Sequence, residues 1–96
     1  MTVSVKYLRK RGERYYFDVD GVPARVTNGY MTQLELNYNG NGDGYVSLID
    51  NGLGTVYRDS DREWDDKADT YFYPFADERE VTIWNAVINE LNARFA

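Results

Sequence analysis

The sequence predicts an α+β fold, an antiparallel sheet of five or six short strands connected as a meander and packed by one C-terminal amphipathic helix. Along the first two thirds of the chain, short segments of alternating apolar and polar residues are separated by glycine-containing turns, a pattern typical of strands joined in hairpins. The last segment instead repeats its apolar residues every three or four positions, the period of a helix. Because half of a 96-residue chain would bury too small a core, we expect one domain spanning residues 1–96.

The alternating segments define the predicted strands. From Thr2 to Tyr7 every second residue is apolar, and the alternation resumes after a predicted turn at residues 11–13. Asp20-Gly21 is a favoured type I′ hairpin pair, because both central positions of that turn require a positive φ. The predicted strands cover residues 2–7, 15–20, 22–26, 30–38, 45–49 and 54–57.

The C-terminal segment predicts one helix from about residue 78 to residue 95. Asp77 followed by Glu80 has the spacing of a capping box, and acidic side chains in the first turn complement the helix dipole. We expect this helix to pack across the sheet. Its predicted apolar face consists of Val81, Trp84, Ile88, Leu91 and Phe95.

The composition argues against catalysis and against a bound cofactor. The sequence has no cysteine and no histidine, which excludes disulfides, thiolate or imidazole metal ligands, and the Ser-His and Cys-His arrangements of nucleophilic enzymes. We therefore expect a protein that is not an enzyme. No apolar run approaches the ~20 residues of a membrane helix, and the first six residues lack the apolar segment of a signal peptide. These features predict a soluble protein of the cytoplasm, or of the host cytoplasm if the chain is viral.

Charge is distributed unevenly along the chain, whose formal net charge is −5. Residues 1–25 hold six basic side chains against three acidic ones, a balance of +3. Residues 26–96 hold five basic side chains against thirteen acidic ones, a balance of −8. We expect an electric dipole whose acidic side steers the protein toward a basic partner.

The segment from residue 59 to residue 78 is the predicted partner-binding surface. Residues 59–69 carry six acidic side chains and are expected to form an exposed acidic loop, and residues 71–75 are expected to be extended and aromatic. Aromatic side chains anchor protein interfaces, and surrounding charges set the encounter rate and the choice of partner. The alternative interpretation is that the rings belong to the core and the acids are merely solvated. The predicted binding residues are Asp59, Asp61, Glu63, Trp64, Asp65, Asp66, Asp69, Tyr71, Tyr73 and Phe75.

In general character the chain is similar to small viral inhibitors of host defence nucleases, including inhibitors of the anti-CRISPR type. The likeness is one of composition and rests on no motif: the chain is short, acidic and rich in tyrosine, and it lacks the usual catalytic side chains. This likeness implies that the chain is a protein-binding inhibitor that acts as a DNA mimic. Its carboxylates would imitate a row of phosphates, and the chain would occupy a nucleic-acid groove of its target.

A calcium-binding loop is one alternative function. Residues 39–50 match the spacing of an EF-hand loop, with oxygen-bearing side chains at the first, third and fifth positions, glycine at the sixth and a carboxylate at the twelfth. The first position is an asparagine, the twelfth is an aspartate in place of glutamate, and the flanking segments alternate as strands do. A plain hairpin loop therefore fits better. The candidate ligands are Asn39, Asn41, Asp43 and Asp50.

Nucleic-acid binding by the N-terminal hairpin is the other alternative. Residues 6–17 combine basic side chains with tyrosines, as single-strand binders do. The rest of the molecule is strongly acidic and would repel phosphate, so we expect a solvated turn and no nucleic-acid partner.

Overall fold

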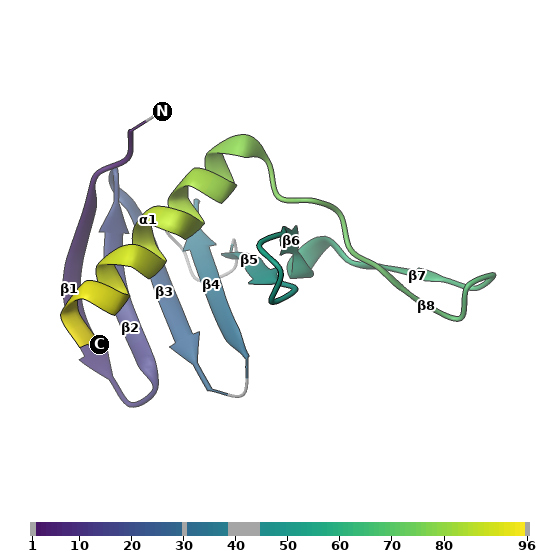
Figure 1. Ribbon diagram of the computed structural model, residues 1–96, viewed down its shortest axis with the longest axis horizontal. Helices are drawn as coiled ribbons and strands as arrows, with labels where there is room; N and C mark the ends of the chain where they lie inside the picture. The colour runs from purple at the N-terminus through teal and green to yellow at the C-terminus, as the bar shows by residue number, and fades with distance from the viewer. Residues whose placement is uncertain (1, 30, 39–44, 96) are drawn as a thin grey trace.

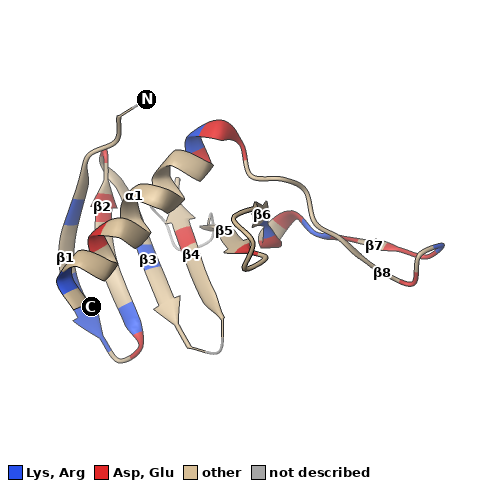
Figure 2. Cartoon of the chain, in the orientation of Figure 1, with Lys and Arg blue, Asp and Glu red and all other residues tan. Residues whose placement is uncertain are grey.

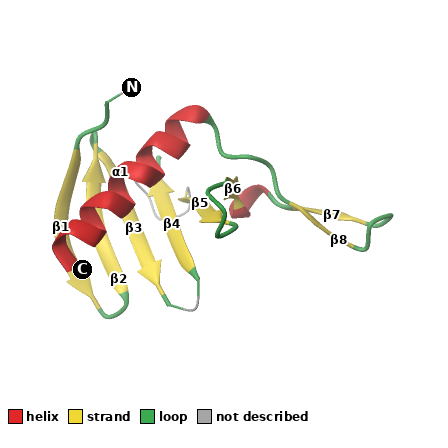
Figure 3. Ribbon diagram, viewed as in Figure 1, coloured by secondary structure: helices red, strands yellow, loops and turns green. Residues whose placement is uncertain are grey.

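The computed structural model describes residues 2–29, 31–38 and 45–95. It confirms the predicted α+β fold. Six strands form one antiparallel sheet in which every strand lies beside its neighbours in the sequence, and one helix covers a face of that sheet (Figures 1 and 3). The strands are β1 (Val5–Arg11), β2 (Arg14–Val19), β3 (Val22–Asn28), β4 (Thr32–Asn37), β5 (Tyr45–Asp50) and β6 (Val56–Arg58). The remaining elements are η1 (Asp59–Asp61), β7 (Glu63–Asp65), β8 (Thr70–Phe72) and α1 (Glu78–Phe95).

The predicted turn between β2 and β3 is confirmed, since Asp20 and Gly21 have φ angles of 51° and 86°. The first strand differs from its prediction, because it begins at Val5 and continues to Arg11. The pairing of β1 with β2 shifts between Tyr7 and Arg9, so Leu8 is an extra residue in a bulge. This extra residue ends the simple alternation in the sequence without ending the strand.

One face of the sheet and one face of α1 form the core. Alternate residues of β2 to β5 point toward the helix, which crosses the sheet diagonally (Figure 1). Every buried apolar residue of the described chain lies in this cluster. It comprises Phe17, Val19, Ala24, Val26, Leu34, Leu36, Leu48 and Val56 from the sheet, and Ile83, Trp84, Val87 and Leu91 from the helix.

The opposite face of the sheet carries charged and aromatic side chains in a cross-strand arrangement. The Arg25 guanidinium lies 4.1 Å from the ring centre of Tyr45, and its Nε donates to Glu35 Oε1 at 2.9 Å. The hydrogen bond to Glu35 raises the pKa of Arg25, an effect that partial burial opposes. On the neighbouring strands, Arg9 lies over the ring of Tyr16. Paired polar groups of this kind allow a sheet face to remain in contact with water.

The helix has the predicted bounds, but its buried face is rotated from the predicted one. The structure buries Ile83 and Val87 between the helix and the sheet, whereas Val81 and Ile88 are only partly buried. Both sets are apolar, so the apolar stripe is broad and periodicity alone does not fix its centre. Within the described residues, no helix is long and apolar enough to cross a membrane.

The predicted capping box is confirmed at the start of α1. The Glu80 N–H donates to Asp77 Oδ1 at 2.7 Å, and the Asp77 N–H donates to Glu80 Oε1 at 2.9 Å. The Glu80 side chain is also fully buried, which the capping-box spacing did not predict.

A bidentate ion pair with Arg58 explains the burial of Glu80. Arg58 Nε donates to Glu80 Oε1 at 2.8 Å, and Arg58 Nη2 donates to Oε2 at 2.6 Å. This hydrogen bonding raises the pKa of Arg58 well above its already high usual value, so the guanidinium stays charged. The ion pair therefore joins strand β6 to the first turn of the helix.

We predict that Arg58→Met lowers the free energy of unfolding by about 3 kcal/mol, because it leaves the buried Glu80 carboxylate without its cation. Urea denaturation followed by circular dichroism measures the loss. Arg62→Met is the matched control, since the Arg62–Asp59 ion pair is more exposed and its loss is expected to cost less than about 1 kcal/mol. Equal unfolding free energies for the two variants would contradict a structural role of the Arg58–Glu80 pair.

Candidate protein-binding arm

Residues 59–76, called the arm below, leave the sheet after β6 and return to it before α1. The segment predicted as a loop instead contains the short helical turn η1 and the hairpin of β7 and β8. Figure 1 shows the hairpin extending away from the sheet and helix. The three pairs of the hairpin are Glu63 with Phe72, Trp64 with Tyr71, and Asp65 with Thr70. Since both faces of this hairpin are exposed, no burial pattern marked it in the sequence.

Local side-chain chemistry explains how the hairpin turns. The Asp65 carboxylate accepts hydrogen bonds from the backbone N–H groups of Lys67 and Ala68, at 3.0 Å and 3.3 Å. Asp69 then adopts a φ of 54°, a left-handed conformation that aspartate tolerates better than most residues. Two of the acidic residues therefore shape the turn.

The root of the arm is fixed to the edge of the sheet. The Arg58 N–H donates to the Pro74 carbonyl at 2.9 Å, and the Ala76 N–H donates to the Val56 carbonyl at 3.0 Å. Arg58 Nη1 also donates to Asp61 Oδ2 at 2.9 Å, so one arginine contacts both η1 and the helix. These contacts anchor both ends of the arm to β6.

Five aromatic rings form a continuous row along the arm and onto β6. Neighbouring ring centres lie 5.2, 6.4, 6.5 and 5.4 Å apart, distances typical of interacting rings. In spatial order the members of this aromatic row are Trp64, Tyr71, Tyr73, Tyr57 and Phe75.

The aromatic row lies outside the core. Trp64 is 52% exposed, Tyr71 46% and Phe75 71%, whereas Tyr73 and Tyr57 are half-buried. The adjacent Phe72 is 60% exposed. Exposed rings in such a group favour an interaction surface over a role in the core.

The acidic residues of the arm differ in their surroundings. Asp59 pairs with Arg62 at 3.3 Å and Asp61 pairs with Arg58, so these two carboxylates are neutralised locally. The Asp66 carboxylate accepts a hydrogen bond from the Trp64 indole at 2.7 Å. Figure 2 shows the acidic residues of the arm on the side of the molecule opposite to the basic residues of β1.

Glu63 and Asp69 have neither an ion-pair nor a hydrogen-bond partner among the residues that the structure describes. The predicted acidic cluster is thus brought together only in part. The carboxylates free to meet an external cation lie on the hairpin, and those of η1 are used to hold the arm.

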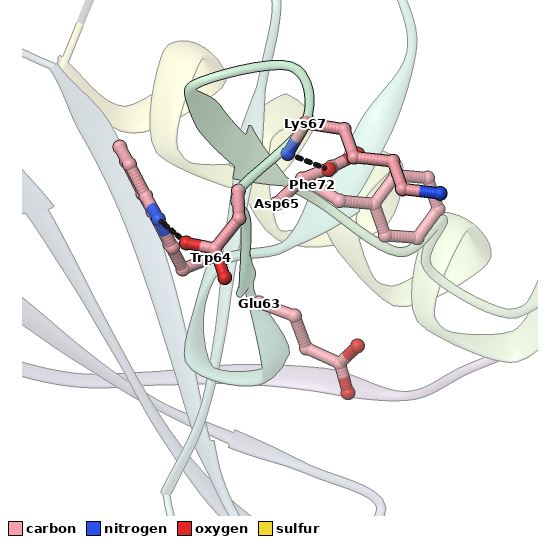
Figure 4. A pocket seen from close by; sticks show the side chains of 6 residues that line it. Glu63, Trp64, Asp65, Lys67 and Phe72 are labelled. Carbon is pink, nitrogen blue, oxygen red and sulfur yellow. Dashed lines mark hydrogen bonds between the residues drawn. The ribbon is translucent and has the colours of Figure 1, made fainter.

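Two hollows flank the hairpin. The first, of about 390 Å³, lies among Glu63, Trp64, Asp65, Asp66, Lys67 and Phe72 (Figure 4). The second, of about 480 Å³ and mainly apolar, lies between the hairpin and the sheet edge. Its lining residues are Ile49, Asp50, Asn51, Tyr57, Tyr71, Phe72, Tyr73 and Phe75.

The second hollow involves residues that the sequence prediction did not include. Tyr57 was assigned to a strand and Phe72 to the aromatic stretch, but neither was a predicted binding residue. The alternation of residues 71–73 places Phe72 on the hairpin face opposite to its neighbours. No local pattern shows that Tyr57 meets Phe75, because that contact follows from the return of the arm to β6.

The predicted calcium loop lies mostly outside the described residues, which include neither Asn39, Asn41 nor Asp43. Asp50 is described and ends β5, where it pairs with Val56. Among the residues whose placement is described, no group of three or more acidic side chains is arranged to hold a metal ion.

The basic N-terminal hairpin uses its tyrosines in contacts of its own. Lys10 lies over the ring of Tyr15, which also packs against Phe95 with ring centres 4.8 Å apart. The ring of Tyr16 is covered in part by Arg9. These rings stabilise the hairpin and the end of the helix, so they are less available for stacking with bases.

No protein-family model matches the chain, and neither a curated protein nor a solved structure is significantly similar to it.

We predict that Trp64→Ala leaves the free energy of unfolding within about 1 kcal/mol of the wild-type value, because the indole is exposed and both its ring partner Tyr71 and its hydrogen-bond partner Asp66 belong to the arm. Trp84→Ala is the matched control, as the buried Trp84 is expected to contribute about 3–5 kcal/mol. Chemical denaturation of both variants tests the comparison. A large loss with Trp64→Ala would show that the arm is part of the cooperative core.

Proposed function

We propose that the protein is a non-enzymatic binding module that captures a protein with a basic surface through its arm, and that it acts as an inhibitor. The observation that carries this proposal is the row of exposed rings on an acidic hairpin held away from the core. Large rings supply contact area with little loss of conformational entropy, and central aromatics commonly dominate binding energy.

The charge of the arm supports a basic partner. Residues 59–76 hold six acidic and two basic side chains, a balance of −4 in a chain whose total is −5. Such a concentration of charge accelerates encounter with a positive surface and disfavours acidic proteins. The rings then provide the short-range contacts that keep the two proteins together.

Inhibition follows if the basic surface of the partner normally binds phosphates. The unpartnered carboxylates of Glu63 and Asp69, with the solvent-facing charge of Asp66, would replace phosphate groups in that surface. A nucleic-acid groove occupied by the arm is closed to its nucleic acid. This is the sense in which the arm would act as a nucleic-acid mimic of the anti-CRISPR or anti-defence type.

The triple variant Glu63→Gln, Asp66→Asn and Asp69→Asn tests the proposal. It removes three negative charges with little change of shape, since an amide oxygen still accepts from Trp64 and asparagine tolerates a positive φ. Affinity capture from cells that naturally produce the chain is expected to recover a basic protein with the wild type and at least 10-fold less with the variant. Added salt and duplex DNA are both expected to release the captured protein.

Leu53→Ser is the matched control, because Leu53 is 87% exposed and lies outside both hollows. This variant is expected to capture as much partner as the wild type. Retention of the same partner by the triple variant, or retention that is independent of salt, would contradict binding through the acidic arm. Release by salt but not by DNA would contradict mimicry while leaving charge-driven binding in place.

A further inference from the structure

The hairpin of β7 and β8 is a sheet of two strands only. Among the described residues, no other strand pairs with either of them. In an antiparallel pair, each strand points some of its backbone N–H and C=O groups toward its partner and the others away from it. Two strands alone are only marginally stable in water, and a third strand supplies the missing hydrogen bonds. The hairpin therefore presents edges at which an extended segment can pair.

The edge of β7 is open, whereas the outer edge of β6 is not. Glu63, Trp64 and Asp65 are all exposed, and their backbone groups make no hydrogen bond to a described residue outside the hairpin. The hollow of about 390 Å³ is lined by all three of these residues, so open space lies beside the strand (Figure 4). Along β6, in contrast, residues 74–76 use the backbone groups of the strand.

The pairing register gives the hairpin one acidic face and one aromatic face. Paired residues share a face and neighbours along a strand alternate, so Glu63 and Asp65 lie opposite to Trp64 and Tyr71. Glu63 has no partner among the described residues, and Figure 4 shows its carboxylate pointing away from the other labelled side chains. Asp65 accepts backbone N–H groups of the turn through Oδ1 alone, and no described cation pairs with its charge.

These two faces determine which segment fits beside β7. Side chains of an added strand alternate between the faces, so two of them lie next to Glu63 and Asp65, where a positive charge is favoured. The residue between them lies next to the Trp64 indole, where an apolar side chain is favoured. A second copy of β7 fits poorly, since its own carboxylates would lie against those of the first. The β8 edge makes no such selection, because its three residues carry no charge.

We propose that β7 is a docking edge for an extended segment of the partner protein in which basic and apolar residues alternate. The segment adds a third strand to the hairpin. Its basic side chains contact Glu63 and Asp65, and an apolar side chain covers Trp64. The inference rests on the proposed function and deepens it, because it names the conformation and the sequence pattern by which a basic partner is recognised.

Fluorescence anisotropy with two labelled peptides tests the sequence pattern. One peptide is Lys-Val-Lys-Val-Lys and the other is Lys-Lys-Lys-Val-Val, so the two have the same composition and the same charge. The wild-type chain is expected to bind the alternating peptide about 3- to 10-fold more tightly, because only that order matches charged and apolar side chains to the two faces of the hairpin.

Two N-methylated forms of the alternating peptide test the backbone pairing. Successive N–H groups of a strand point to opposite edges, so methylation at the lysines blocks one edge and methylation at the valines blocks the other. One form is expected to bind about 10-fold more weakly than the unmodified peptide, because it loses its backbone hydrogen bonds to β7. The other form is expected to bind as the unmodified peptide does.

The double variant Glu63→Gln with Asp65→Asn tests the assignment to β7. It is expected to lose the preference for the alternating peptide and to keep its hairpin, since an amide oxygen still accepts the N–H groups of the turn. Glu13→Gln with Glu90→Gln is the matched control, because it removes the same charge outside the arm and is expected to keep the preference. Circular dichroism checks that both variants fold as the wild type does.

Equal affinity for the two peptides, or binding that survives both methylation patterns, would overturn strand addition. If that binding still fell in the Glu63 and Asp65 double variant, attraction of basic segments by the charge of the arm would stand without strand pairing. A preference that persists in the double variant would overturn the assignment to β7. Methylation-sensitive binding of the alternating peptide, with no basic protein captured from cells, would count against the proposed function alone.

A second copy of the chain is the competing occupant, through its own uncharged β8 edge. Sedimentation equilibrium with and without the alternating peptide distinguishes this case. The proposal expects a monomer that binds the peptide. Self-association that the peptide reverses would assign the edges of the hairpin to a second copy and overturn recognition of a foreign segment.

Discussion

The ion pair between Arg58 and Glu80 is the contact on which the arrangement of sheet, helix and arm depends. Glu80 is fully buried, and its carboxylate is shared between the cap of the helix and the guanidinium of β6. The same guanidinium reaches Asp61 at the root of the arm. Because removing one partner leaves a charge buried without compensation, the pair resists separation more strongly than an exposed pair would. A long acidic hairpin can thus project from a small domain with its position defined at the base.

Much of the fold followed from the sequence because its signals are local. Strand alternation, the Asp20-Gly21 turn and the capping box at Asp77 each act over a few residues, and the structure confirms them. The bulge at Leu8 depends on the register with strand β2, and the burial of Glu80 depends on Arg58, so patterns within a few residues did not reveal them. A glutamate in the first helical turn normally faces water, and only its pairing with Arg58 across 22 positions reverses that expectation.

The candidate site was predicted in part for the same reason. Composition identified the acidic and aromatic stretch, and Trp64, Tyr71 and Phe75 are exposed while Tyr73 is half-buried. Composition did not separate the carboxylates that hold the arm from those that are free. The hollow between the hairpin and the sheet edge could not be predicted, because Tyr57 and Phe75 lie on segments that meet only after the arm returns to that edge. A site built from two segments that are distant in the sequence cannot be recognised from either segment alone.

Both edge strands of the sheet are protected against pairing with a further strand, although by different means. On the β6 side, residues 74–76 run beside the strand and use its backbone groups. On the β1 side, the irregular Leu8 twists the strand locally, and lysine and arginine side chains would repel another copy laid alongside. Flat, unprotected edge strands promote fibril growth and amorphous aggregation. The exposed rings of the hairpin are therefore carried by a sheet whose two edge strands are both protected against pairing with another chain.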